Sequence, residues 1–332
     1  MFFRLTPVFL AAGLLATGGA STLAAQDKIL NASFDVSREL FREINPAFRA
    51  RWKADTGRDI DIEQSHVGST QQARALLDGL QADVVTLNQQ TDMDALTRAG
   101  LVAADWRARL PFHAAPYTSI VVFVVRAGNP KHIRDWDDLL RPGVRVSLVN
   151  PKTSGNGRYA FLGAWAFAST RKGGDYGGAR AFVTGLYHNV PVLDLGGRAA
   201  TSTFADRGLT DVLITFESEG RLLQKKFGAA RFEIVTPSVT LLAEFPVSVV
   251  DAVVNRRGTR KVASAYLEFL YSKEGQTIIA RNGYRPRISQ EAASPDGGGI
   301  LNVDQVFGGW TGIQARFFAD GGIFDQIYET GR

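Results

Sequence analysis

The sequence predicts an α/β protein in which short buried strands alternate with amphipathic helices. Short apolar runs recur along the chain and are separated by segments with helical periodicity, a pattern typical of sheets covered by helices. Two longer apolar runs, Ile120–Val125 and Phe245–Val254, stand on either side of a central block of shorter ones. We therefore expect two lobes, a chain that crosses between them twice, and a ligand cleft between the lobes.

The chain begins with a segment built like a secretory signal peptide. Arg4 is followed by the apolar stretch Val8–Ala16 and by small residues up to Ala25. This stretch is too short to span a bilayer comfortably, which disfavours the alternative of an uncleaved membrane anchor. We expect cleavage near Ala24–Gln26, which removes residues 1–25 and leaves an exported, periplasmic protein.

The first part of the first lobe is expected over residues 26–118. Its predicted strands are Ile29–Ala32, Ile60–Ile62 and Val84–Leu87. The helix after the first strand has an apolar stripe that consists of Leu40, Ile44, Phe48 and Trp52. Because Pro46 lies within it, we expect a kink or a restart capped by Asn45. The next helix begins near Ser69 and is expected to bury Ala73, Leu76, Leu77 and Leu80.

The second lobe is expected over residues 119–245. Its predicted strands are Ile120–Val125, Val144–Val149, Val190–Leu193, Val212–Phe216 and Phe232–Val235. Residues 246–332 are expected to return mainly to the first lobe, through the rest of the strand Phe245–Val254 and a set of C-terminal helices.

Several turns between a strand and a helix share one design. The turns at Asp35, at Ser69 and at Ser154–Asn156 each combine a strand end, small residues and a helix start, and Gly196–Gly197 form a fourth turn. Such turns present free backbone N–H groups and the positive end of a helix dipole, which suit an anion. One such turn is weak evidence, because every α/β protein has several. Their distribution over both lobes favours an anion held between the lobes.

Enzyme and nucleic-acid functions find little support. There is no G-x-x-x-x-G-K-[ST] phosphate loop, no G-x-S-x-G turn and no Cys, and the four His residues lack metal-ligand spacing. The net charge is +5 without a dense basic run, which argues against nucleic acid as a partner. We therefore expect no catalysis, no cofactor and no metal. Met93 is the only Met beyond the leader, and so sulfur-poor a composition would suit a protein made when sulfur is scarce.

Many segments closely resemble the periplasmic sulfate/thiosulfate-binding proteins of ABC transporters. They are "SFDVSRELF", "QSHVGSTQQA", "ADVVTLN", "RAGNPKHIRDWDDL", "NPKTSGNGRY", "GGRAATSTFADRGLTDVLITFESE", "LAEFPVSVVD" and "FGGW". The resemblance covers nearly the whole chain after the leader. It implies a two-lobed periplasmic-binding-protein fold of type II, a monomer that closes on one anion, and delivery of sulfate or thiosulfate to a membrane permease.

The resemblance also implies the ligand contacts. They are the amides of Asp35, Gly155, Asn156 and Gly197, the amide of Ser69 with its hydroxyl left open as a second donor, and the hydroxyl of Ser154. The sulfate type has Gly where Asn156 stands and an indole donor where Phe216 stands, so in both respects this sequence looks more like the thiosulfate-binding type. Neither His66 nor Lys152 is expected to pair with the anion.

Two other functions stay open at this point. One is a carrier for another tetrahedral oxyanion such as molybdate. The other is an anion sensor that docks on a signalling receptor instead of a permease.

Overall fold

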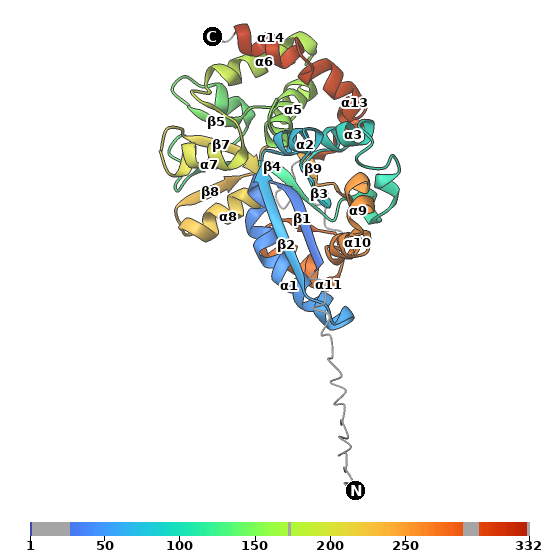
Figure 1. The fold of residues 1–332 in the computed structure, drawn as a ribbon. Coiled ribbons are helices and arrows are strands. Elements are labelled where there is room, and N and C mark those ends of the chain that lie inside the picture. Colours follow the sequence, from blue (N-terminus) through green and yellow to red (C-terminus); the bar gives the residue numbers. More distant parts are fainter. Residues whose placement is uncertain (2–26, 172–173, 288–298, 331–332) are drawn as a thin grey trace.

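The buried strands form two separate sheets, and helices cover both (Figure 1). The structure is a computed structural model that describes residues 1, 27–171, 174–287 and 299–330. The predicted signal peptide and its cleavage region, Met1 apart, lie outside the described residues. Within the described ranges, no helix is both long and apolar enough to cross a membrane.

The first sheet has the order β10-β3-β1-β2. Its strands are β1 (Asp27–Phe34), β2 (Ile60–Val67), β3 (Val84–Thr86) and β10 (Val247–Val249), of which β10 alone runs antiparallel to its neighbour. The helical segments of this lobe are η1 (Asp35–Ser37), α1 (Arg38–Thr56), α2 (Ser69–Leu77), α3 (Gln90–Arg98), η2 (Trp106–Ala108), α4 (Pro111–Ala114), α9 (Asp251–Arg257), α10 (Arg260–Phe269) and α11 (Lys273–Arg281).

The second sheet has the order β12-β9-β4-β7-β5-β6, and β8 and β11 also pair with β4. Its strands are β4 (Tyr117–Arg126), β5 (Val146–Val149), β6 (Leu193–Asp194), β7 (Val212–Phe216), β8 (Phe232–Val235), β9 (Val239–Glu244), β11 (Arg285–Pro286) and β12 (Gly299–Leu301). The helical segments here are η3 (Trp136–Leu140), α5 (Gly155–Thr170), α6 (Tyr176–His188), α7 (Gly197–Ala205), α8 (Glu217–Phe227), α12 (Val303–Phe307), α13 (Trp310–Ile313), η4 (Gln314–Phe318) and α14 (Ile323–Thr330).

The chain passes between the two sheets at β4 and again at β9, which pairs with the start of β4 before the chain enters β10. A further passage follows α11, because β11 pairs with the start of β4 and β12 pairs with β9. Aromatic rings pack at these passages. The ring of Phe245 lies 5.2 Å from that of Phe34 in the first lobe and 5.2 Å from that of Phe216 in the second. The end of β1 and the end of β7 are therefore packed on one common side chain.

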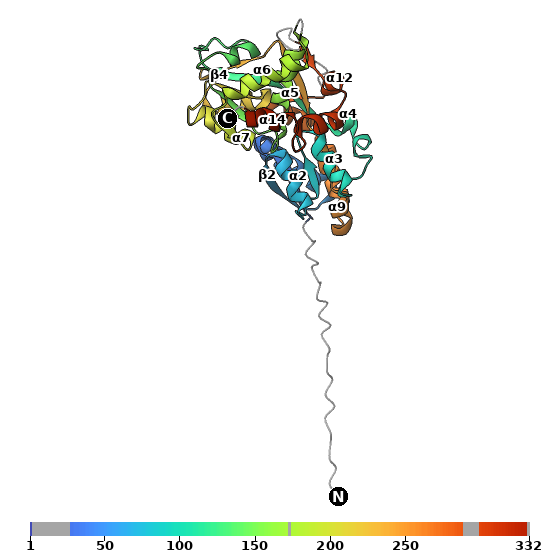
Figure 2. The ribbon, with the colours of Figure 1, turned by 90° about the horizontal axis from the view of Figure 1, so that it is seen from above.

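The last helices lie on the second lobe, whereas we expected residues 246–332 mainly on the first. α14 packs on α6, where the rings of Phe324 and Tyr187 lie 5.6 Å apart, and both views show α14 beside α6 (Figures 1 and 2). α13 also contacts α3 of the first lobe. The lobe boundaries at 118/119 and 245/246 stay a prediction.

Strands β7 and β8 occupy the residues predicted for them, and β1 to β5 each overlap their prediction. The long strand predicted at Phe245–Val254 is wrong. It is divided into β10 and the first turns of α9, because Val250, Val253 and Val254 are spaced to bury one side of a helix, and all are buried. Strand β9, which supplies the second passage, was not predicted at all.

Other local expectations also need correction. α1 continues through Pro46 without a restart, and its buried stripe of apolar residues packs along the whole helix. The predicted strand Val190–Leu193 shrinks to β6 at Leu193–Asp194. Leu77 is 45% exposed, and Leu80 lies beyond the end of α2, so neither extends its buried face as expected.

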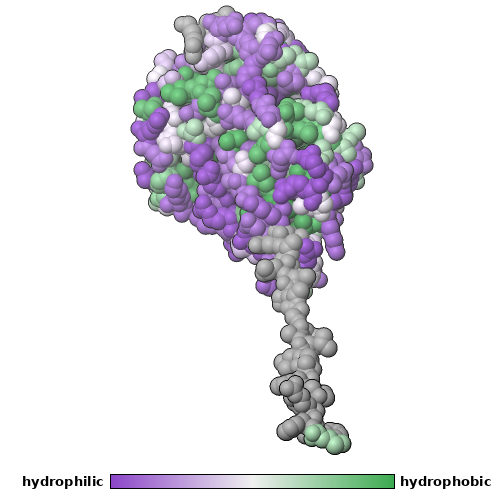
Figure 3. Space-filling model, in the orientation of Figure 1, coloured by the Kyte–Doolittle hydropathy of each residue, from purple (hydrophilic) through white to green (hydrophobic). Residues whose placement is uncertain are grey.

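Hydrophilic side chains cover most of the face shown in Figure 3, with hydrophobic residues in several separate groups.

Candidate functional site

The predicted anion-binding residues lie at the points where strands end and helices begin. Asp35 opens η1 after β1, and Ser69 opens α2 after β2. Ser154 is the N-cap of α5, so Gly155 and Asn156 are the first residues of that helix, and Gly197 is the first residue of α7. Backbone N–H groups at such positions have no acceptor within their own helix. Helix starts from both lobes therefore offer donors to one region.

Close contacts bring these helix starts together across the lobes. The N–H of Arg198, next to Gly197, donates to Oδ2 of Asp35 over 2.9 Å. A Cβ on Gly155 would lie 2.0 Å from Oδ1 of Asn88, whose own N–H donates to Oγ of Ser69 over 3.2 Å. The first-lobe and second-lobe residues of the predicted site are thus neighbours in one buried interface.

Gly197 and Asn156 meet within the second lobe. A Cβ on Gly197 would lie 3.3 Å from Nδ2 of Asn156 and 3.7 Å from Oδ1 of Asp35. Phe216 is fully buried and packs edge-on against Tyr159 and Phe245, with ring centroids 5.8 and 5.2 Å apart. Its neighbour Thr215 links it to the predicted anion-binding residues, because Oγ1 of Thr215 accepts a hydrogen bond from Nδ2 of Asn156. We call this group of residues at the helix starts the cluster.

The hydroxyl of Ser154 is buried, and none of the described residues forms a hydrogen bond with it. Although Ser154 is an N-cap residue, its side chain does not cap the helix. A buried hydroxyl without a partner is costly, so its position among helix N-termini points to a ligand that accepts a hydrogen bond.

The hydroxyl of Ser69, left open above as a second donor to the anion, is bonded to Asp92 in this structure. The hydroxyl of Ser69 donates its single hydrogen to Oδ2 of Asp92 over 2.6 Å and accepts from the N–H of Asn88. It has no second hydrogen for an anion. The backbone N–H is the donor that Ser69 still offers.

The carboxylate of Asp35 accepts hydrogen bonds from two backbone N–H groups. It accepts from the N–H of Val36 over 3.0 Å and from that of Arg198. Burial raises the pKa of Asp35, and the hydrogen bond from Arg198 opposes this shift.

One charged cluster ties α7 to both lobes. The guanidinium of Arg198 lies 2.6 Å from Oε2 of Glu39 in α1 and 3.3 Å from Oε1 of Glu219 in α8. Burial raises the pKa of Glu219 to about 7, while Arg198 and the hydroxyl of Thr201 oppose this shift. The cluster joins the helix that carries Gly197 to the first lobe.

Lys152 and His66 are the two basic residues that we expected not to pair with the anion. Nζ of Lys152 contacts carboxylates of the C-terminal segment, Asp325 at 2.9 Å and Asp320 at 3.2 Å. Burial lowers the pKa of His66 to about 4, so its ring is neutral near pH 7. In the described part of the chain, His, Asp and Glu side chains form no group able to hold a metal ion.

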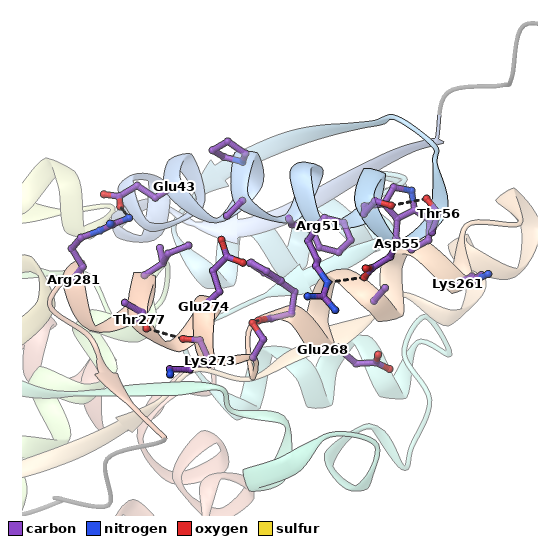
Figure 4. Close-up of a pocket in the computed structure, with 18 residues that line it drawn as sticks. Glu43, Arg51, Asp55, Thr56, Lys261, Glu268, Lys273, Glu274, Thr277 and Arg281 are labelled. Atoms are coloured by element: carbon purple, nitrogen blue, oxygen red, sulfur yellow. Dashed lines mark hydrogen bonds and ion pairs between the residues drawn. The ribbon is translucent and has the colours of Figure 1, made fainter.

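A cavity of about 1180 Å³ lies between α1 and the pair α10–α11 (Figure 4). Its lining includes the aromatic residues Phe48, Trp52 and Phe269. Charged residues such as Arg51 and Glu268 also line it. It contains none of the predicted anion-binding residues.

Comparison with known proteins assigns the family. The sequence model described as "Bacterial extracellular solute-binding protein" matches residues 32–285. The chain belongs to this family. A thiosulfate-binding protein of Pseudomonas aeruginosa is 50% identical to this solute-binding protein over 330 residues, 98% of each chain. A sulfate-binding protein of Escherichia coli K12 is 48% identical over 320 residues, 95% of this chain and 97% of the relative.

The solved structures agree with a type II periplasmic-binding-protein fold. The sulfate-binding protein SubI from Mycobacterium tuberculosis matches with a TM-score of 0.77 and 32% identity, over 88% of this chain and 100% of that one. A periplasmic thiamin binding protein shares the fold alone, at a TM-score of 0.62 and 16% identity, over 82% of this chain and 86% of that one.

Sequence reasoning missed the residues of this solute-binding protein that support the helix starts. Asn88 packs against Gly155, and Thr215 holds the side chain of Asn156. Arg198, Glu39 and Glu219 form the charged cluster. Arg198 is part of the turn segment "GGRAATSTF", but no local sequence pattern predicts which distant carboxylates it contacts.

Proposed function

We propose that this solute-binding protein binds thiosulfate or sulfate between its lobes and delivers it to an ABC importer in the inner membrane. The observation that carries the proposal is the hydroxyl of Ser154 at the N-terminus of α5, which is buried and has no hydrogen-bond partner among the described residues. The starts of α2 and α7 lie in the same interface. The printed functions of the relatives at about half identity support the same anions. The predicted contacts are Asp35, Ser69, Ser154, Gly155, Asn156 and Gly197, with Phe216 beside them.

The mechanism rests on neutral donors. A dianion would accept hydrogen bonds from helix N-termini and one hydroxyl, while the nearby charged side chains pair with one another. Sulfate and thiosulfate carry no proton near neutral pH, whereas phosphate carries at least one. A phosphate proton would face another donor, and one unmatched buried polar group costs about 1–3 kcal/mol.

Closure would complete the donor set, because Asp35 and Ser69 come from the first lobe and the other donors from the second. We propose that cleavage near Ala24–Gln26 releases the protein into the periplasm, where it works as a carrier without catalysis.

Isothermal titration calorimetry of the purified protein tests the proposal. Sulfate, thiosulfate, phosphate and molybdate should be titrated separately at one pH. We expect a sulfur oxyanion to bind roughly 10- to 100-fold more tightly than phosphate. Tight binding of molybdate or phosphate with no response to either sulfur anion would overturn the assignment. Delivery to the importer is tested by measuring sulfate and thiosulfate uptake in cells that lack the gene for this protein, which we expect to be reduced.

A further inference from the structure

The side chain of Asn156 lies between three structural elements of the second lobe. Asn156 is the second residue of α5 and is 3% exposed. Its Nδ2 donates to Oγ1 of Thr215 in β7 over 3.1 Å. The same nitrogen would lie 3.3 Å from a Cβ on Gly197, the first residue of α7. The carboxamide thus stands where α5, α7 and the end of β7 meet.

The hydrogen bonds of this carboxamide are incomplete. A primary amide nitrogen has two hydrogens, and among the described residues Thr215 is the one acceptor for them. Leaving a buried donor hydrogen without an acceptor is unfavourable, so such groups are normally paired. Two residues earlier, at the N-cap of the same helix, the hydroxyl of Ser154 is also buried and has no partner among the described residues. The start of α5 therefore carries two side-chain donors that the described part of the protein does not fully use.

We infer that the second Nδ2 hydrogen of Asn156 donates to the bound anion, and that Thr215 positions the amide to do so. This inference rests on the proposed function and extends it from the backbone of Asn156 to its side chain. Asn156 then supplies two donors from one residue, its backbone N–H and its carboxamide. Gly197 makes room for this arrangement, because a side chain there would crowd Nδ2.

The neighbouring ring explains why a donor is needed from this direction. Phe216 directly follows Thr215, is fully buried, and has no hydrogen to donate. The hydrogen bond from Asn156 to Thr215 places a carboxamide next to this ring, so a polar contact with the anion can come from α5 where Phe216 offers none.

Variants of Asn156 separate its side chain from its backbone. Asn156→Gly keeps the backbone N–H and should weaken the binding of both sulfate and thiosulfate roughly 10- to 100-fold in calorimetry. Asn156→Asp is nearly isosteric and should weaken binding more at pH 8, because it places a carboxylate beside a dianion. Burial beside a dianion should raise the pKa of this carboxyl group above its ordinary value of about 3.9, so binding should recover partly near pH 4.5, where part of the variant regains a hydrogen to donate.

Variants of Thr215 test positioning. Thr215→Val should weaken binding less than Asn156→Gly does, and Thr215→Ser should restore it because the hydroxyl returns. Asn189→Asp serves as the matched control, since Asn189 donates to the carbonyls of Leu139 and Arg141 and, within the described part of the chain, forms no hydrogen bond with any of the predicted anion-binding residues. Melting curves without anion identify any variant that fails to fold.

The outcomes separate the inference from the proposed function. Unchanged binding in a folded Asn156→Gly protein would overturn the inference, because the side chain would then make no contact with the anion. Tighter binding would overturn it too, because it would mean that the amide oxygen faces the anion. An Asn156→Asp protein whose affinity does not change with pH would overturn it too. If the wild-type protein binds neither sulfur anion, the proposed function itself fails.

Discussion

Ser154 offers a buried hydroxyl that no described residue uses. We predict that Ser154→Ala weakens anion binding roughly 10- to 100-fold, because a hydrogen bond to a charged group is lost. The unfolding temperature without anion should hardly change, since the hydroxyl makes no hydrogen bond within the described part of the protein. Calorimetry and melting curves measure the two effects.

Lys152→Gln is the control for Ser154→Ala, because the ammonium group of Lys152 contacts the C-terminal segment instead of the helix starts. If Lys152→Gln abolished binding while Ser154→Ala did nothing, the neutral-donor mechanism would be wrong.

Phe216 tests anion preference. An indole at this position would bring back a donor, which favours sulfate because all its outer atoms are strong acceptors, whereas the terminal sulfur of thiosulfate is weaker. Phe216→Trp should therefore shift preference towards sulfate by up to about tenfold. The larger ring must fit against Tyr159 and Phe245, so melting curves are needed beside the two titrations. An unchanged ratio in a folded variant would leave Phe216 as a packing residue only.

The raised pKa of Glu219 predicts that the stability of the folded protein depends on pH. Its pKa of about 7 lies above the usual value of 4.5, so the folded protein holds the proton more tightly than the unfolded chain. The stability from this group is present below pH 4.5 and is lost as the pH rises through 7. The groups that face it are Arg198, Thr201, Asp35 and Glu39.

Glu219→Gln should remove this loss. Its unfolding temperature relative to wild type should rise between pH 5 and pH 8, by on the order of 5 °C. A difference that stays constant over this pH range would show that Glu219 does not titrate there.

At the scale of the elements, the start of α5 must fit against the loop after β3. A Cβ on Gly155 would lie 2.0 Å from Oδ1 of Asn88, which belongs to the other lobe. Gly155→Ala should therefore block closure and weaken anion binding at least about tenfold, while each lobe keeps its own packing. Gly163 is the control in the same helix, because a Cβ there would meet Trp136 within the second lobe, 2.9 Å away.

Gly163→Ala should lower the unfolding temperature and leave affinity nearly unchanged, the reverse of Gly155→Ala. Equal losses of affinity in both variants would contradict a role for Gly155 in closure.

The sequence predicted those elements whose signals are local. β7 and β8 are short and mostly apolar runs, and the turns at Ser69 and Ser154 combine small residues with a helix start. The division between β10 and α9 could not be predicted, because a run such as "VSVVDAVV" suits either structure until its neighbours are known.

The residues that orient the helix starts could not be predicted from the sequence for a different reason. Arg198 and Glu39 are 159 residues apart, and Asn156 and Thr215 are 59 apart, so only the folded topology brings them together. The helix starts could be predicted one by one, but not the partners that orient the residues there.

At the scale of the whole molecule, contacts between the lobes define a closed arrangement. Arg198 pairs with Glu39 across them, and a Cβ on Gly68 would lie 2.7 Å from the carbonyl oxygen of Thr153. We predict that the anion-free protein is more open in solution, so that saturating thiosulfate reduces its radius of gyration in small-angle scattering. Gly155→Ala should not show this compaction, and a wild-type radius that does not change would argue against closure of the two lobes.

The passages at β4, β9 and β11 lie side by side, and Phe245 among them touches the end of β1 and the end of β7. This arrangement has a kinetic consequence. In the proposed site a bound anion has donors on both lobes, so it would not leave while the lobes stay together, and its residence time would be limited by how often they separate. A substitution at the passages, far from any donor, would then change association and dissociation rates together and leave the equilibrium affinity nearly the same. A receiving permease would shorten the residence time by pulling the lobes apart, without touching the anion at all.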